Sequence, residues 1–187
     1  MGVLGTVRSE LIKVKHTSFG VIHLCVPVLG ALLFIVYYVL YGNTADYKKL
    51  KMILELTATI FPLLISVVVS LNVLLEEKAS HFQILLGVPN RYKVVLIKLA
   101  VLYGAGITAL FCLFLVFLLG VHFLRIDDTI QLSMLVKAAA GMAFCNLIIY
   151  ALHLFLSFRF GLGISLFWGV FESCLLYTSD AADDLTR

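Results

Sequence analysis

The chain has 187 residues, of which 62% are hydrophobic and only 13% are charged, and its mean hydropathy is +1.07. Soluble domains are about 45–50% apolar and about 25% charged, so this composition indicates a membrane protein and excludes a sizeable soluble catalytic domain. The net charge of +3 is too small and too scattered for a nucleic-acid-binding surface, and it better fits charges that flank and orient membrane spans.

The start of the chain predicts an interfacial helix followed by two spans. Four apolar residues recur there at helical spacing: Leu4, Val7, Leu11 and Val14. This pattern predicts an amphipathic helix that lies in the membrane interface, the alternative being a short solvated lead-in. The apolar runs at residues 18–41 and 54–75 are each long enough to cross about 30 Å of hydrocarbon, so each predicts a span.

The longest polar interruption, residues 76–93, is still patterned. Four apolar residues keep helical spacing in or beside it: Leu75, Ala79, Phe82 and Leu86. Charged and polar residues occupy most other positions, and Gly87 and Pro89 then supply stop signals. We therefore expect a short amphipathic helix between the second and third spans.

The next two apolar runs predict two more spans. The third run, residues 94–124, is longer than a perpendicular span needs, so we expect it to tilt, to kink near Gly104 and Gly106 or to extend beyond the bilayer. Lys98, near its start, is expected to snorkel to the interface. The fourth run covers residues 132–158.

The fifth run is short and ends in a segment of different character. It follows a tight reversal expected at Gly161–Gly163 and ends at about Phe171, which is only part of a span. Residues 174–187, CLLYTSDAADDLTR, resemble the translated read-through of a sequencing adapter or vector, the alternative being a genuine acidic cytoplasmic tail. The sequence therefore predicts an all-α transmembrane bundle of four full spans and part of a fifth within residues 1–171.

The distribution of Lys and Arg predicts the orientation of the bundle. On the N-terminal side lie Arg8, Lys13, Lys15, Lys78, Arg91, Lys93, Lys98 and Arg159. The other side carries Lys48, Lys49, Lys51, Arg125 and Lys137. Because the side richer in Lys and Arg is the cytoplasmic one, we expect the N-terminus and the insert at residues 76–89 in the cytoplasm, within reach of a soluble partner.

Motifs for catalysis on this chain are few. No G-x-x-x-x-G-K-[ST] motif occurs, so the chain cannot hold the phosphates of ATP in the manner of a P-loop. The pair Glu76–Glu77 suggests the alternative of an intramembrane metal-dependent protease, in which such a pair activates water. The CAAX-type proteases carry E-E-x-x-x-R, but here His81 takes the place of the Arg, and no Arg follows until Arg91.

Other polar residues within the apolar runs favour packing roles. The spacing of His23, His122 and His153 is not that of metal ligands, which favours helix–helix hydrogen bonds. Ser165 lacks the G-x-S-x-G setting of a serine nucleophile. Glu172 is a carboxylate late in an apolar run, which ordinarily indicates a functional site, but it adjoins the suspected foreign junction and is therefore set aside.

Three stretches carry a family resemblance: SELIKVKHTSFGVIHLCVPVLGALLFIVYY, LLEEKASHFQILLGVPNRYKVVLIKLAVL and YALHLFLSFRFGLGIS. Together they resemble the permease subunits of lantibiotic-immunity ABC transporters, within the type-2 ABC exporter group. The resemblance covers most of residues 8–168. Its most specific part is the insert, in which acidic residues after the second span precede His-Phe-Gln, Leu-Leu-Gly and a basic stretch.

The resemblance implies six transmembrane helices in the intact protein, a separate ATP-binding subunit that holds ATP and Mg²⁺, and a second permease subunit, identical or different. It implies no enzyme activity and no cofactor on this chain. Such complexes expel a lantibiotic or similar bacteriocin peptide from the cytoplasmic membrane of the bacterium that produces it. A further alternative is a membrane-bound immunity protein that sequesters the peptide without an ATPase.

The resemblance also implies roles for particular residues. Those that would contact the ATP-binding subunit are Glu76, Glu77, Lys78, His81, Phe82 and Gln83. Arg91 and Lys93 would anchor the exit of this segment at the lipid headgroups, and we expect Arg159 to be a third interface anchor. The alternative for Glu76 and Glu77 is a solvated helix start that the helix dipole favours.

Overall fold

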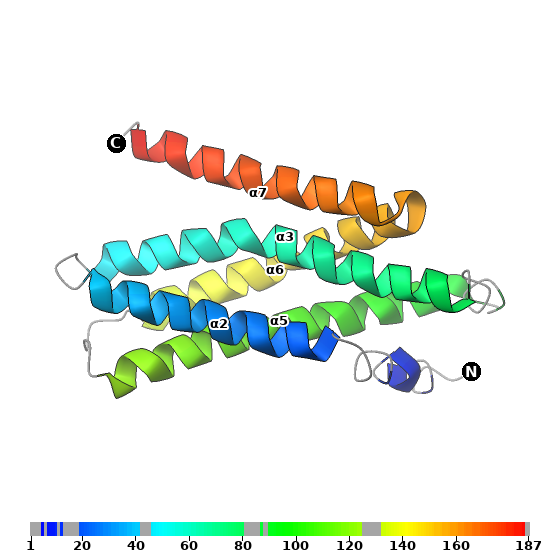
Figure 1. The fold of residues 1–187 in the computed structure, drawn as a ribbon, viewed down its shortest axis with the longest axis horizontal. Helices are drawn as coiled ribbons and strands as arrows, with labels where there is room; N and C mark the ends of the chain where they lie inside the picture. Colours follow the sequence, from blue (N-terminus) through cyan, green and yellow to red (C-terminus); the bar gives the residue numbers. More distant parts are fainter. Residues whose placement is uncertain are drawn as a thin grey trace.

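The computed structural model of the chain describes residues 5, 7–10, 12, 19–41, 46–80, 87, 90–124 and 132–185. Its five long helices are α2 (Phe19–Leu40), α3 (Asp46–Ser80), α5 (Arg91–Phe123), α6 (Leu132–Phe160) and α7 (Leu162–Leu185). They lie side by side in an elongated bundle (Figure 1). For the part of the chain that the structure describes, the prediction of an all-α fold is confirmed.

Five helices in the described ranges are long and apolar enough to cross a membrane, which is the architecture of a multi-pass membrane protein. The candidate spans, by length and composition, are Gly20–Leu40, Lys48–Ala79, Arg91–Phe123, Leu132–Phe160 and Leu162–Ser179. The fifth differs from the prediction, because its 18 residues make a full-length span. Residues 172–179 continue the helix and supply the difference, while the foreign origin of residues 174–187 stays a prediction.

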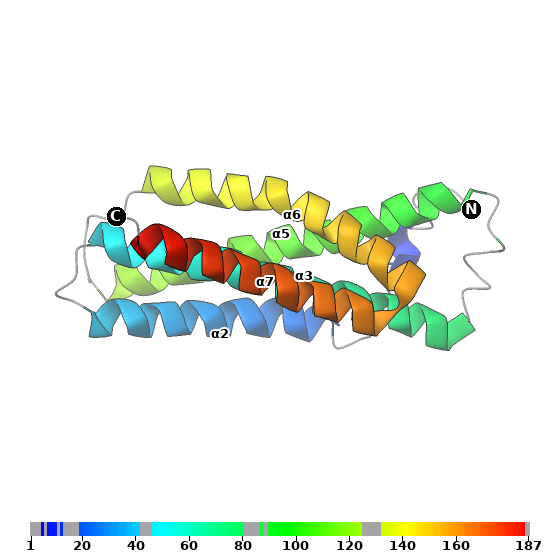
Figure 2. The same cartoon turned by 90° about the horizontal axis from the view of Figure 1, so that it is seen from above.

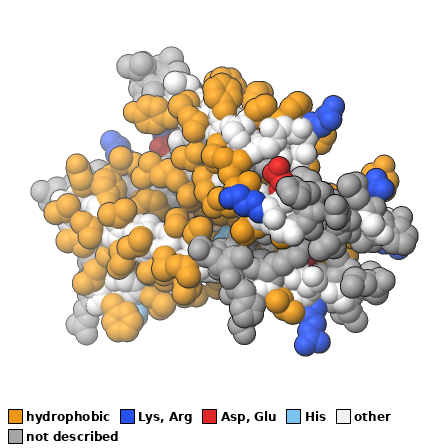
Figure 3. Space-filling model, turned by 45° about the vertical axis from the view of Figure 1, so that its right-hand side comes forward, with side chains coloured by type: hydrophobic (Ala, Val, Ile, Leu, Met, Phe, Trp, Pro, Cys, Tyr) orange, Lys and Arg blue, Asp and Glu red, His pale blue; other side chains and the backbone are white. Residues whose placement is uncertain are grey.

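Helix α3 runs through the bundle and packs against α6 and α7, whereas α2 packs mainly against α5 (Figure 2). On α3 the apolar residues Ile65, Val69 and Val73 recur at helical spacing and are at most 2% exposed. The outer faces expose many large apolar side chains, which cover much of the face seen in Figure 3. Such exposure costs nothing where lipid tails rather than water surround the helices.

The polar insert begins differently from the prediction. Helix α3 has 35 residues and continues without a break to Ser80, so Glu76 and Glu77 lie near its C-terminal end and not at the start of a separate helix. The reason is that no Gly or Pro separates Leu75 from Ser80, and Glu, Lys and Ala favour helix. The helix dipole therefore does not favour these two carboxylates, and that alternative is wrong. The remainder of the predicted insert helix, residues 81–86 and 88–89, lies outside the described residues.

Helix α5 is continuous over its 33 residues, so Gly104 and Gly106 do not interrupt it. The side chain of Asn90 caps its start by accepting a hydrogen bond from Lys93 N at 3.3 Å. Gly106 has a packing role instead, because a Cβ at this position would collide with the Tyr150 side chain of α6. The glycine thus allows α5 and α6 to approach closely.

A tight reversal joins α6 to α7, as predicted. Gly161 has φ 82°, a conformation that glycine adopts without strain, and its N–H donates to Ser157 O at 3.1 Å. One residue later α7 begins at Leu162 and runs back along the bundle. The reversal therefore brings the first turns of α7 alongside the last turns of α6.

Candidate functional site

Three charged side chains, Glu10, Glu76 and Lys98, are buried together at one end of the bundle; we call them the charged cluster. Lys98 Nζ donates to Glu76 Oε2 at 2.6 Å and to Glu10 Oε2 at 3.4 Å. The side chains are 2% exposed for Lys98, 8% for Glu76 and 4% for Glu10. The cluster connects α3 and α5 to the N-terminal segment, which has helical backbone at residues 7–10.

The prediction that the Lys98 side chain snorkels to the membrane interface is wrong. Lys98 lies about two turns inside α5, and its side chain is buried against α3 and the N-terminal segment. A buried ammonium needs charged hydrogen-bond partners in place of water, and two carboxylates supply them. The sequence concealed this arrangement because Glu76 and Glu10 are 22 and 88 residues away along the chain.

The structure describes three of the six side chains expected to contact an ATP-binding subunit. Glu77 and Lys78 are exposed at the end of α3, whereas Glu76 is buried and bonded to Lys98. The other three lie outside the described residues: His81, Phe82 and Gln83. Contact of this segment with a partner stays a prediction.

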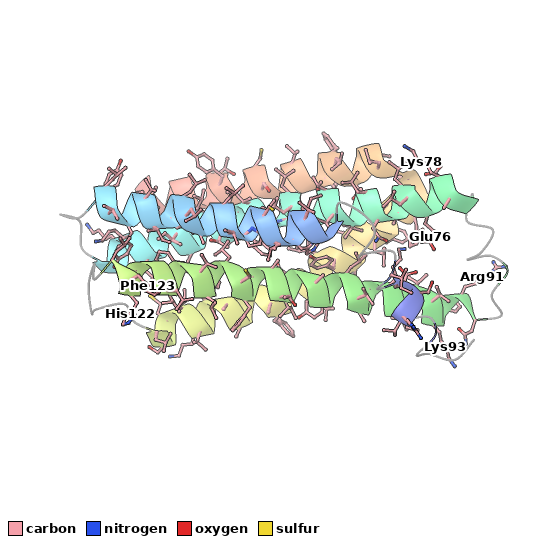
Figure 4. All side chains as sticks on the ribbon, turned by 60° about the horizontal axis from the view of Figure 1, so that its bottom comes forward. Glu76, Lys78, Arg91, Lys93, His122 and Phe123 are labelled. Carbon is pink, nitrogen blue, oxygen red and sulfur yellow. The ribbon has the colours of Figure 1, made fainter. Side chains whose placement is uncertain are left out.

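The three predicted interface anchors are exposed and lie at the same end of the bundle as Lys78. Figure 4 shows Arg91 and Lys93 at that end and His122 at the opposite one. Arg159 is in the last turn of α6, and the connection from α6 to α7 lies at this end too (Figure 1). Binding of these side chains to lipid headgroups stays a prediction.

A second polar group lies where α6 meets α7. His153 and Ser165 are fully buried, and His153 Nδ1 lies 3.1 Å from Ser165 Oγ. His153 Nε2 lies 3.2 Å from Glu172 Oε2, whose side chain is 20% exposed. The helix–helix hydrogen bonding predicted for His153 is therefore confirmed.

Two contacts extend this group to α3. Ser70 Oγ and Ser157 Oγ are 3.1 Å apart and share a hydrogen bond between α3 and α6. Gly169 of α7 packs on Ser66, so closely that an added Cβ would collide with that side chain. We call the whole set the polar seam; its members are Ser66, Ser70, His153, Ser157, Ser165, Gly169 and Glu172.

Helical periodicity could have revealed part of the polar seam. Ser165, Gly169 and Glu172 follow one another at steps of four and three, which places them on one face of α7. His153 and Ser157 are likewise one turn apart on α6. In the sequence, Glu172 adjoins a segment of different character and shows no partner, whereas the structure gives it a hydrogen bond within the bundle.

The geometry of both groups favours packing and positioning over bond-breaking chemistry. Among the described residues, no three His, Cys, Asp or Glu side chains gather closely enough to hold a metal ion. Glu76, considered above for a protease, is bonded to Lys98. Ser165 has His153 beside it but no exposed surface through which a substrate carbonyl could approach.

An apolar cavity of about 230 Å³ lies between α2 and α3. Its walls include Phe34 and Tyr37 of α2, Ile53 and Leu64 of α3, and Leu113 of α5. The cavity separates two helices that touch little elsewhere. Its lining is mostly apolar, and the hydroxyls of Thr57 and Tyr37, which also line it, are bonded to Ile53 O and to Met52 Sδ.

Comparison with family models, with curated proteins and with solved structures gave no match for this chain. The resemblance to lantibiotic-immunity permeases therefore rests on the three sequence stretches quoted above. The fold and the two polar groups are observed in the structure of this chain itself.

Proposed function

We propose that the chain is a membrane permease subunit of an ABC transporter that expels a lantibiotic or similar bacteriocin peptide from the producer's membrane. A separate ATP-binding subunit would supply the energy, with ATP and Mg²⁺ bound there. The observation that carries the proposal is the polar insert after the second span, where the family resemblance is most specific. Its described flanks expose Glu77 and Lys78 on one side and Arg91 and Lys93 on the other.

The helices that flank the insert suit mechanical coupling. α3 and α5 are both unbroken, with 35 and 33 residues, so a displacement at the insert is transmitted along stiff rods through the bundle. Rigid-body motion of this kind needs only a partner that grips the exposed end. Nucleotide-driven closure of an ATP-binding subunit would then tilt two spans at once.

The remaining parts of the proposal follow from charge and from family likeness. The excess of Lys and Arg on the N-terminal side favours a cytoplasmic N-terminus and insert in the membrane of a bacterium. A second permease subunit, identical or different, would complete the pathway. The large exposed apolar faces of the helices leave room for it and for lipid.

The test is to look for an ABC ATP-binding subunit encoded beside this chain and to co-express the two. We expect the two to co-purify from membranes, and the double variant Glu77→Lys with Phe82→Ala to reduce the retained subunit at least about tenfold, since reversing a charge at a contact opposes binding. The matched control is Lys137→Glu, an exposed charge reversal at the start of α6, at the opposite end of the bundle.

Unchanged co-purification of the double variant contradicts the coupling role. So does equal loss in the Lys137→Glu control, because that would show a general effect of charge. Stoichiometric zinc in the purified protein, lost on Glu77→Ala, would instead establish the metal-dependent protease. The exposed position of Glu77 makes this substitution safe for folding.

A further inference from the structure

The charged cluster joins segments that the sequence separates widely. Lys98 Nζ is the shared atom, because it donates to a carboxylate of α3 at 2.6 Å and to a carboxylate of the N-terminal segment at 3.4 Å. Each of the three side chains comes from a different segment. The ammonium of Lys98 on α5 therefore contacts a carboxylate from each of the other two segments.

Burial makes this junction resistant to separation. The three side chains are at most 8% exposed, so water does not screen their attraction. Pulling one carboxylate away from Lys98 would break a charged hydrogen bond in a poorly solvated site, which is unfavourable for buried ion pairs. The N-terminal segment and the ends of α3 and α5 are thus expected to move as one body.

The junction also adjoins the polar insert on both sides. Glu76 directly precedes the exposed pair Glu77 and Lys78 on α3. On the other side of the insert, α5 begins at Arg91 and places Lys98 about two turns later. Both ends of the connection between α3 and α5 therefore lead into the charged cluster.

We propose that Lys98 is a positioning residue that transmits movement of the insert to the N-terminal segment. The inference rests on the proposed function, because it takes the insert to be the part on which an ATP-binding subunit acts. When that subunit displaces the ends of α3 and α5, the two Lys98 hydrogen bonds carry the N-terminal segment along. The segment thereby follows the motor without touching it.

Spin labels at two exposed positions test this transmission. Ser9→Cys reports on the N-terminal segment and Ala79→Cys on the end of α3, in a protein whose four native cysteines are replaced by alanine. The labelled protein is assembled with its ATP-binding subunit in lipid nanodiscs, and spectra are recorded with and without ATP and vanadate. We expect both labels to respond in the otherwise unchanged protein.

Lys98→Met separates the two responses. We expect position 79 to keep its response and position 9 to lose about nine-tenths of it. A tenfold loss corresponds to about 1.4 kcal/mol of the free energy that couples the two segments, which is less than the cost of breaking a buried ion pair. Lys137→Met is the matched control: it removes the same charge at an exposed position on α6, away from the insert, and both responses should persist.

Three outcomes overturn the inference about Lys98 and leave the proposed function standing. They are an undiminished response at position 9 in Lys98→Met, an equal loss in Lys137→Met, and a response at position 79 alone when the charged cluster is unsubstituted. If the chain binds no ABC ATP-binding subunit and neither label responds, the proposed function fails and the inference fails with it. The two kinds of failure are therefore distinguishable.

Glu10→Gln keeps the test decisive if Lys98→Met fails to insert into the membrane. This variant leaves the 2.6 Å pair between Lys98 and Glu76 intact and removes only the charge on the N-terminal side. Position 79 should respond fully and position 9 less, because a neutral amide oxygen accepts the Lys98 hydrogen bond more weakly than a carboxylate does. The matched control is Glu55→Gln, which removes a partly exposed carboxylate that pairs with Lys51 at 3.0 Å within α3. Loss of the position 9 response in this control, or its undiminished persistence in Glu10→Gln, contradicts the inference.

Discussion

The charged cluster and the polar seam are both buried, but they hold different things together by different means. In the charged cluster, ion pairs fasten a segment outside the spans to the ends of two spans. In the polar seam, hydroxyl, imidazole and carboxylate groups cross-link spans to one another with hydrogen bonds of 3.1–3.2 Å. The chain thus places its buried ion pairs at one end of the bundle and distributes the weaker hydrogen bonds of the polar seam along α6 and α7.

The two kinds of contact also differ in the free energy lost when one is removed. Breaking a buried ion pair by removing one partner costs about 3–5 kcal/mol, whereas hydrogen bonds between membrane helices average about 0.6 kcal/mol. The charged cluster should therefore be sensitive to single substitutions. The polar seam should tolerate the loss of any one hydrogen bond, because close packing at Gly169 and several other contacts remain.

The largest effect is expected from Lys98→Met, which takes from two buried carboxylates the ammonium that they share. We expect the free energy of unfolding, measured with increasing SDS in mixed micelles, to fall by about 3–5 kcal/mol. Lys93→Met, exposed on the same helix, should change it by less than about 0.5 kcal/mol.

The triple variant Glu10→Gln, Glu76→Gln, Lys98→Met shows whether charge is the cause. It removes all three charges, so most of the lost stability should return, because replacing a whole buried ion cluster is often close to neutral. If the triple variant is as unstable as Lys98→Met, the loss of stability comes from packing. The charged cluster would then not differ from the polar seam through its charges.

The next largest effect is expected from Gly169→Val in the polar seam. Its Cβ would collide with Ser66 and approach the backbone oxygen of Pro62 to 3.4 Å, so α7 must move away from α3. Overpacking of this kind costs about 1–3 kcal/mol in the same unfolding measurement. Gly141→Val on α6 is the control, because nothing lies within 4 Å of its added Cβ. Equal effects of the two substitutions would mean that helix propensity, and not the α3–α7 contact, decides.

Much of the fold could be predicted from composition and run length, because lipid imposes a length on each span. The runs at residues 18–41, 94–124 and 132–158 each match a helix of the structure closely. The end of the second span could not be predicted this way. Leu75 is the last residue of its apolar run, but helix formation depends on backbone hydrogen bonds, and Glu76–Ser80 form them as readily as the apolar residues do.

The site was harder to predict than the fold, because its contacts join residues far apart in the sequence. A Lys near the start of an apolar run usually reaches the interface, and only the fold brings Glu10 and Glu76 to Lys98. The sequence predicts helix–helix hydrogen bonding for His153 correctly, but it does not identify Ser165 and Glu172 as the partners. Pairing them required the direction of α7, which the Gly161 reversal determines.

A smaller effect is expected at the hydrogen bond between His153 and Glu172. In a double-mutant cycle with His153→Leu and Glu172→Gln, we expect a coupling energy of about 1 kcal/mol, because the bond is only partly exposed to solvent. The control cycle pairs His153→Leu with Glu77→Gln, an exposed carboxylate at the end of α3, and should be additive within about 0.5 kcal/mol. Additivity in the first cycle would remove Glu172 from the polar seam.

The smallest effect is expected at the hydrogen bond between Ser70 and Ser157, and it gives the most direct comparison with the charged cluster. Ser70→Ala and Ser157→Ala remove one hydroxyl each, and the coupling energy of their cycle should be about 0.6 kcal/mol, typical of hydrogen bonds between membrane helices. Thr108→Ala is the matched control, because the Thr108 hydroxyl bonds to Gly104 O within its own helix at 2.9 Å. Its cycle with Ser70→Ala should show no coupling.

The size of the Ser70–Ser157 coupling decides whether the two regions differ in kind. A value near the loss of about 3–5 kcal/mol expected for Lys98→Met would show that any polar contact buried in this bundle is equally strong, whatever its charge. A value several times smaller assigns the strength of the charged cluster to its charges and burial. The hydroxyl pair then orders α3 against α6 without locking them, which leaves α6 free to shift against α3 while the charged cluster at the end of α3 stays closed.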